Sequence, residues 1–138
     1  ETVLVTDIER ATSIMRTIRD MGCTLAIDDF GTGYSSLSYL KSLPADFIKI
    51  DRSFVANIVE NADDRNIVHS TIAMVRKMGL IVVAEGIETA EQFEMLCHFD
   101  CQMGQGYLIS RPIPEPDIWT TLSKNVHMGI WDSTRSNE

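Results

Sequence analysis

Short apolar runs alternate with amphipathic stretches along the chain, in the order typical of parallel α/β proteins. The apolar runs at residues 25–27, 47–50 and 80–84 predict buried strands, and a fourth, shorter strand is predicted around Met103. Because the run at 80–84 is the most hydrophobic, we expect both of its faces to be covered. Periodic apolar positions predict helices between the strands, at residues 8–21, 34–40, 52–59, 67–79 and 117–124, with one more beginning near residue 89.

Two of these helices have a capping-box spelling at their start. Thr6-Asp7-Ile8-Glu9 and Thr89-Ala90-Glu91-Gln92 each place a hydroxyl three residues before a Glu or Gln, so we expect a helix to begin at each. Glycines follow the first helix and the helix that reaches residue 79, as is typical of helix ends. In the first helix we expect one apolar face to pack on the sheet, formed by Ile8, Ala11, Met15, Ile18 and Met21.

Acidic residues stand where the predicted strands end. Asp28 and Asp29 close the first apolar run, and the same order of helix, glycine, strand and acid recurs 57 positions later with Glu85 in place of Asp28. Between these copies, another apolar run includes Lys49 and is followed by Asp51. Since successive parallel strands point the same way, we expect these five side chains to gather on one edge of the sheet.

Two adjacent carboxylates repel each other, and a cation offsets that cost. The first hypothesis is therefore a divalent metal ion at the end of a strand, with an ordinary polar turn as the alternative. Gly31-Thr32-Gly33 precedes a predicted helix, so its backbone N–H groups could also face an anion.

Composition limits the classes of partner. The 138 residues, 44% of them hydrophobic, suffice for one domain at most, and the net charge of −8 argues against a nucleic-acid polymer or an anionic membrane surface. A phosphate substrate stays possible, because bound metal ions can supply positive charge. With no apolar window of membrane-spanning length and no leader at the start, we expect a cytoplasmic setting. The chain begins with Glu rather than Met, so we also expect sequence upstream of it.

Three cysteines, Cys23, Cys97 and Cys101, make an odd number, which favours reduced thiols over a disulfide framework. The segment 97–101 resembles a zinc knuckle but lacks a second ligand pair. The three histidines, at positions 69, 98 and 127, lie away from the predicted acidic edge, and we expect packing or solvated roles for them.

Two other families share part of this pattern. Residues 29–31 spell the metal-binding triplet of protein kinases, but neither a glycine-rich nucleotide loop nor a His-Arg-Asp loop accompanies them. Receiver-like phosphoacceptors also combine an acidic pair, a lysine and Mg2+ on a parallel sheet. Their lysine lies after the last strand and their phosphorylated Asp lies in the middle of the chain, whereas Lys49 is only 21 positions past Asp28 here, so this alternative is the weaker one.

The spelling of the acidic segments resembles the EAL-domain family of cyclic di-GMP phosphodiesterases. The similar segments occur in the family's order and cover residues 1 to about 120: DDFGTGYSSL at 28–37, LP at 43–44, KIDRSF at 49–54, AEGIE at 84–88, QGYL at 105–108 and SRP at 110–112. The resemblance implies an α/β fold, a modified (β/α)8 or TIM-like barrel in which parallel strands alternate with helices. It also implies two Mg2+ or Mn2+ ions, which activate a water that opens cyclic di-GMP to linear pGpG.

The resemblance also implies roles for single residues. Asp28 and Asp29 would be metal ligands, Glu85 would act on the metal side or through a water, and Lys49 would orient the attacking water. Gln105 would contact substrate, and Glu88 would contact substrate or the loop after the Asp pair. Glu1 matches the acidic residue that braces this loop in the family.

The Glu-Ala-Leu motif and two further metal-binding residues of the family would lie upstream of Glu1. A full barrel needs about 250 residues, so we expect residues 1–124 to be the C-terminal half of an EAL domain, followed by a polar tail at 125–138. We expect little activity from the chain alone, and its partner would be the N-terminal half of the barrel or a second copy in a homodimer. The alternative is a non-catalytic fragment that binds cyclic di-GMP or another protein.

Overall fold

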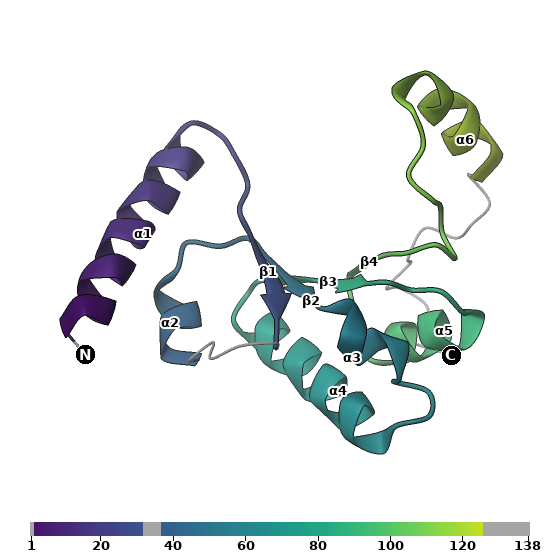
Figure 1. Cartoon of the computed structure of the whole chain (residues 1–138), viewed down its shortest axis with the longest axis horizontal. Helices are drawn as coiled ribbons and strands as arrows, with labels where there is room; N and C mark the ends of the chain where they lie inside the picture. The colour runs from purple at the N-terminus through teal and green to yellow at the C-terminus, as the bar shows by residue number, and fades with distance from the viewer. Residues whose placement is uncertain (1, 32–36, 126–138) are drawn as a thin grey trace.

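The four strands form one parallel sheet. The computed structural model describes residues 2–31 and 37–125, shown in Figure 1. Within these ranges the strand order is β1-β2-β3-β4, every neighbouring pair is parallel, and the strands are β1 (Ala26–Phe30), β2 (Phe47–Ile50), β3 (Ile81–Glu85) and β4 (Met103–Gln105). The prediction of parallel strands that alternate with helices is confirmed.

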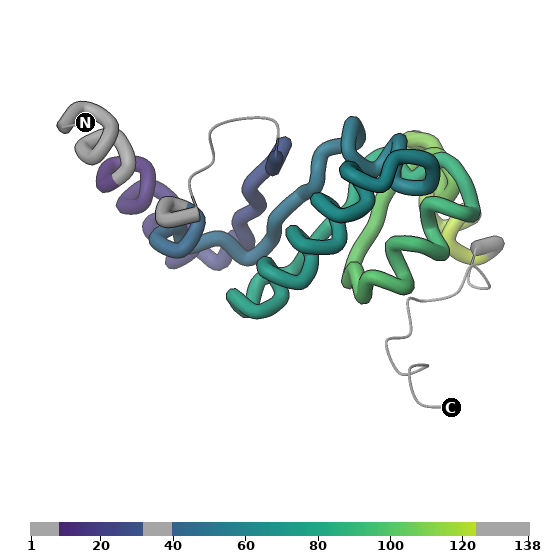
Figure 2. The backbone as a smooth tube through the Cα atoms, turned by 90° about the horizontal axis from the view of Figure 1, so that it is seen from below, coloured from purple at the N-terminus to yellow at the C-terminus, as the bar shows by residue number. Residues whose placement is uncertain are grey.

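The helices connect the strands in sequence. They are α1 (Thr2–Asp20), α2 (Leu37–Ser42), α3 (Arg52–Ala56), α4 (Ala62–Lys77), α5 (Ala90–His98), the 3-10 turn η1 (Glu115–Asp117) and α6 (Ile118–Asn125). Right-handed crossovers between adjacent parallel strands place their helices on one face of a sheet. Figures 1 and 2 show α3, α4 and α5 together on one side of the strands, as in part of a (β/α)8 barrel.

The core lies between this helical layer and the sheet. Burial alternates along β2 and β3, so that Ile48 and Ile50, Val82 and Ala84 are buried while the residues between them are only half-buried. Fully buried side chains from the helices complete this core: Val55 from α3, Val68, Ile72 and Val75 from α4, and Leu96 from α5. The expectation that both faces of residues 80–84 are covered is therefore wrong, because only the helical face of β3 is fully buried.

Both capping boxes lie in helices, but only one begins its helix. Thr89 caps α5, with its side chain accepting from Gln92 N while the Gln92 side chain accepts from the backbone of Thr89. Thr6 lies inside α1, which begins at Thr2. No glycine or proline stands in residues 2–5, so nothing prevents the helix from extending upstream of the capping-box spelling.

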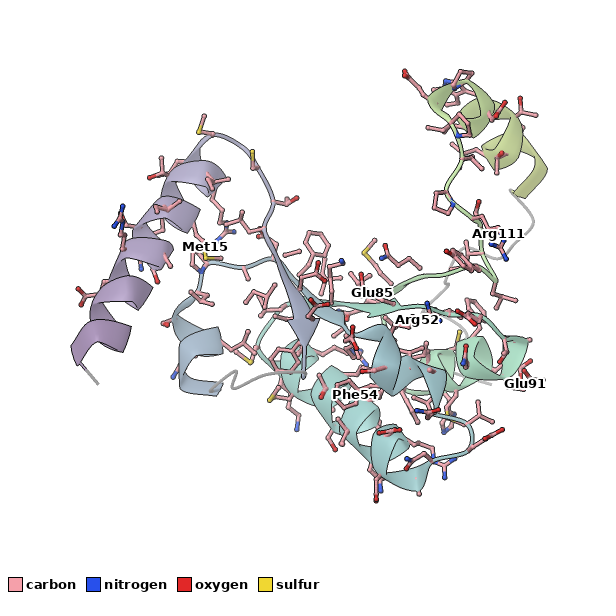
Figure 3. All side chains as sticks on the ribbon, in the orientation of Figure 1. Met15, Arg52, Phe54, Glu85, Glu91 and Arg111 are labelled. Atoms are coloured by element: carbon pink, nitrogen blue, oxygen red, sulfur yellow. The ribbon has the colours of Figure 1, made fainter. Side chains whose placement is uncertain are left out.

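The expected packing of α1 on the sheet is wrong. Ala11 and Met21 are exposed, and Met15 and Ile18 are half-buried; Figures 1 and 3 show α1 standing beside the sheet rather than over it. Within the described residues β1 is an edge strand and no strand precedes α1, so no crossover brings this helix over the sheet. Instead, Arg19 Nη2 lies 2.9 Å from Asp46 Oδ1, which ties the helix end to the segment before β2.

Three helices end with the same pair of backbone bonds. After α4, Gly79 N donates to Arg76 O and Leu80 N to Val75 O, and Gly79 has a φ of +78°. After α1, Gly22 N donates to Arg19 O and Cys23 N donates to Ile18 O. After α5 the left-handed position is taken by Asp100, with a φ of +57°. The predicted stops at Gly22 and Gly79 are confirmed.

The segments that follow β3 and β4 are joined through their backbones. Ile87 N donates to Gln105 O at 3.1 Å, and Leu108 N donates to Ile87 O at 3.0 Å. Gly106 lies between these bonds, and a Cβ there would stand 2.1 Å from Ile87 O. Only glycine permits this approach.

All three cysteines are free thiols. Cys23 is exposed, Cys97 is half-buried and Cys101 is buried. In the part of the chain that the structure describes, no helix combines the length and the apolar character needed to cross a bilayer.

Gly106→Ala should lower the free energy of unfolding by about 3 kcal/mol, because a methyl group would overlap a backbone carbonyl that cannot yield easily. Gly79→Ala is the matched control. Its Cβ would meet nothing within 4 Å, so only the left-handed backbone is strained, at about 1–2 kcal/mol. Urea unfolding followed by circular dichroism measures both; equal losses would contradict the close approach at Gly106.

Thiol labelling should distinguish the exposed cysteine from the other two by its rate of reaction. Burial raises the pKa of the Cys101 thiol to about 11, and burial also raises the pKa of Cys97, so both stay protonated at pH near 8. We expect rapid reaction of Cys23 alone with a disulfide reagent in the folded chain, and of all three cysteines in guanidinium. Rapid labelling of Cys101 in the folded chain would contradict its burial.

Candidate active site

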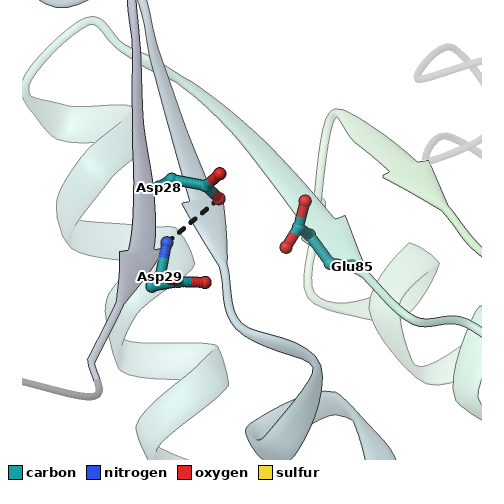
Figure 4. Close-up of side chains that lie close together, drawn as sticks. All are labelled: Asp28, Asp29 and Glu85. Atoms are coloured by element: carbon teal, nitrogen blue, oxygen red, sulfur yellow. Dashed lines mark hydrogen bonds between the residues drawn. The ribbon is translucent and has the colours of Figure 1, made fainter.

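A β-bulge places two carboxylates at the end of β1. Ile27 pairs with Ile48 and Phe30 pairs with Ile50, so Asp28 and Asp29 together stand opposite Lys49 alone. In a regular strand these two side chains would point to opposite faces. Here Asp29 has a φ of +50°, and Figure 4 shows both carboxyl groups on the side of β1 that faces β3.

Glu85, the last residue of β3, completes an acidic cluster with this pair. Asp28, Asp29 and Glu85 each offer a carboxylate oxygen, and these oxygen atoms lie within 4.8 Å of one another. Hard oxygen donors in this number suit a divalent cation such as Mg2+ or Mn2+. The predicted gathering of the acids on one edge is confirmed, and among the described residues no second group of His, Cys, Asp or Glu comes together in this way.

Lys49 extends from β2 between the two acidic strands. Its Nζ lies 2.9 Å from Asp28 Oδ1 and also forms an ion pair with Glu85 Oε1. Gln105, at the end of β4, donates from Nε2 to the same Glu85 oxygen at 2.7 Å. The Lys49 and Glu85 side chains are 24% and 15% exposed, whereas that of Asp28 is 60% exposed and open to solvent.

These contacts favour the charged forms of Asp28 and Lys49. The hydrogen bond from Lys49, together with one from the Asp29 backbone, lowers the pKa of Asp28. Hydrogen bonds to Glu85 and Asp28 raise the pKa of Lys49. These contacts favour the ammonium form of Lys49, which donates hydrogen bonds to both acids.

Asp51 is not part of this acidic cluster. Its side chain caps α3, with Oδ1 accepting from Ser53 N at 2.9 Å and from Ser53 Oγ, and these hydrogen bonds lower its pKa. Asp51 thus lies at the predicted edge, directly after β2, and acts electrostatically on Asp28, but it caps a helix and is not one of the three clustered acids. An Asp directly before a predicted helix is a typical N-cap signal and would have predicted this role.

A cleft of about 520 Å3 lies beside the cluster. It is lined by three residues predicted from the sequence, Glu85, Glu88 and Gln105, and by Arg52, Tyr107 and Arg111, which sequence reasoning did not assign to the site. Figure 3 shows Arg52 close to Glu85, with Arg111 on the segment after β4.

Two contacts shape this cleft. Arg52 Nη2 lies 3.3 Å from Glu88 Oε1, and the Arg52 stem covers Gly86, where a Cβ would stand 2.4 Å from Arg52 Cγ. The Arg111 guanidinium lies 4.4 Å from the centre of the Tyr107 ring, a cation–π contact. The cleft therefore offers cationic and aromatic groups beside an acidic cluster.

Some predicted features lie elsewhere. Glu1 falls outside the described residues, as do Thr32 and Gly33 of the glycine turn. Cys97 and Cys101 belong to no group of metal-binding side chains among the described residues. His69 packs its ring 4.7 Å from that of Phe99, in agreement with the expected packing role.

Comparison with known proteins identifies the family. The family model described as "EAL domain" matches residues 1–112. A cyclic di-GMP phosphodiesterase from Pseudomonas aeruginosa, NbdA, is 46% identical over 114 residues, which are 83% of this chain and 15% of NbdA.

Two solved structures show the same fold. The EAL domain of DcpA from Mycobacterium smegmatis is 47% identical with a TM-score of 0.81, over 90% of this chain and 56% of that one. The complex of Klebsiella pneumoniae BlrP1 with manganese and cyclic di-GMP is 40% identical with a TM-score of 0.67, over 72% of this chain and 26% of that one.

The chain spans about half of the DcpA EAL domain and a small part of NbdA. The family model, the relative and the solved structures all agree with the acidic edge and the strand order of this chain. The chain belongs to the EAL domain family.

Proposed function

We propose that this chain forms part of a metal-dependent phosphodiesterase that hydrolyses cyclic di-GMP to linear pGpG. The observation that carries the proposal is the cluster of Asp28, Asp29 and Glu85, with Lys49 between them, at the C-terminal ends of parallel strands. Active sites of (β/α)8 enzymes are built at this end of the strands. A 46% identical relative is itself described as a cyclic di-GMP phosphodiesterase.

Asp28, Asp29 and Glu85 would hold Mg2+ or Mn2+, and two ions would be bound in the intact domain. Their carboxylate oxygens lie close enough to share a cation, and manganese accompanies cyclic di-GMP in the BlrP1 complex. When bound, such ions lower the pKa of a coordinated water and offset the negative charge of a phosphodiester.

Lys49 and Gln105 would position the reacting groups. Lys49 would orient a water or a phosphate oxygen by donating a hydrogen bond from its ammonium group, which already lies beside Asp28 and Glu85. Gln105 fixes the rotamer of Glu85 by donating to its Oε1, which leaves Oε2 free of that bond. Glu88 and Arg52 form a wall of the adjacent cleft, where they would contact substrate.

The sheet would need a further set of strands to cover its open face and to pair with its edge strands. The face opposite the helices carries Phe47, Val83 and Lys49, which are only half-buried, and β1 and β4 are edge strands of the described sheet. Eight parallel strands close such a barrel. We propose that the N-terminal half of an EAL domain, or a second copy of this chain, covers this face.

Asp28→Asn and Glu85→Gln should each abolish saturable Mn2+ binding, because each removes one of the three charged oxygen donors. Asp63→Asn, which makes the same charge change in the first turn of α4, is the control and should bind Mn2+ as the unmodified chain does. Water-proton relaxation or calorimetric titration measures the binding. Unaltered Mn2+ binding by both cluster variants would refute the metal centre.

The chain alone should show little Mn2+-dependent hydrolysis of cyclic di-GMP, because three carboxylates supply too few protein ligands to hold two ions firmly. Mixing it with the part of the DcpA EAL domain that lies outside the match should restore turnover, provided that the two halves assemble. Product is measured by chromatography, and assembly by light scattering. If the halves assemble and bind cyclic di-GMP without hydrolysing it, the chain belongs to a binding module instead.

A further inference from the structure

We infer that Lys49 is an internal competitor of the metal ion: its ammonium group occupies a cation position between Asp28 and Glu85, and a divalent ion must displace it from these oxygens. This inference rests on the proposed metal centre. It assigns Lys49 a second task, in which it holds the acids together before metal binds and thereby sets how tightly metal is bound.

The contacts of Lys49 are with two of the three candidate ligands. Its Nζ lies 2.9 Å from Asp28 Oδ1 and pairs with Glu85 Oε1, so the ammonium group contacts β1 and β3 at once from β2. Asp28 Oδ1 also accepts from Asp29 N at 3.0 Å. The oxygens that Lys49 engages are therefore drawn from the same carboxylates that a metal ion would need.

The positive charge of Lys49 determines whether this side chain strengthens or weakens metal binding. The three carboxylates of the cluster carry three negative charges, and Lys49 offsets one of them. Without metal, this ammonium group reduces the repulsion among the acids. With a divalent ion nearby, the same positive charge repels the ion, and at a few ångströms in a water-like dielectric this is worth about tenfold in the dissociation constant.

Two features of the site allow the Lys49 ammonium group to leave the acids when a metal ion binds. Gln105 donates to Glu85 independently of Lys49, so Glu85 keeps one anchor when the ammonium leaves. Lys49 has a flexible four-carbon stem and is 24% exposed, so its ammonium can turn toward solvent or toward a bound anion. Displacement from the ligands and donation to a phosphate oxygen are thus compatible tasks for one side chain.

The test compares Mn2+ binding of the unmodified chain with that of Lys49→Met and Lys49→Arg. We expect Lys49→Met to bind Mn2+ about tenfold more tightly and Lys49→Arg to stay close to the unmodified chain. We also expect Lys49→Met to lose thermal stability in EDTA and to regain it in Mn2+, because its acids then repel each other until a metal binds. Lys77→Met, in the last turn of α4, changes the net charge equally and should alter neither measurement.

Unchanged or weaker Mn2+ binding by Lys49→Met would overturn the inference while leaving the metal centre intact. Loss of binding in Asp28→Asn identifies the metal centre separately, and absence of binding in every variant would overturn both. If Lys49→Met does not fold, nitrogen-15 spectra of the lysine ammonium groups of the unmodified chain decide. The Lys49 signal should shift saturably with Mg2+ while that of Lys77 stays constant, and a Lys49 signal that does not respond would refute the inference.

Discussion

Repulsion between carboxylates held on neighbouring parallel strands is the constraint on which this structure depends. Asp28, Asp29 and Glu85 bring their oxygens within 4.8 Å of one another, and only a rigid sheet with a cation beside it can keep them so close. The sheet supplies the rigidity through its fully buried helical face, and Lys49 supplies the charge. The core and the functional edge are therefore parts of one arrangement, since the same strands form both.

Much of this arrangement follows from sequence pattern. The recurrence of helix, glycine, strand and acid at an interval of 57 residues places Asp28 and Glu85 in equivalent positions, and both appear at strand ends in the acidic cluster. Gly22 and Gly79 both adopt the left-handed conformation that ends a helix. These predictions hold because each depends on local backbone chemistry or on the common direction of parallel strands.

The rest could not be predicted, because it depends on contacts between distant segments. A bulge decides that Asp28 and Asp29 share a side of the sheet, and strict alternation would have separated them. Arg111 reaches the cleft only because the segment after β4 runs beside the loop after β3. The periodic stripe of α1 indicates a helix but not its neighbour. Its apolar residues are partly exposed, because no strand precedes this helix within the residues that the structure describes.

The absence of a side chain at Gly106 has a mechanical consequence. Ile87 bonds through its N–H and its carbonyl to the segment that contains Gln105 and Leu108, so main-chain hydrogen bonds hold the two loops together at a distance that only glycine permits. Tyr107 and Arg111, which line the cleft, belong to the segment that is bonded to the backbone two residues beyond Glu85. The wall of the cleft and the segment that follows Glu85 are therefore linked by main-chain hydrogen bonds, which no change of side chain at Tyr107 or Arg111 would remove.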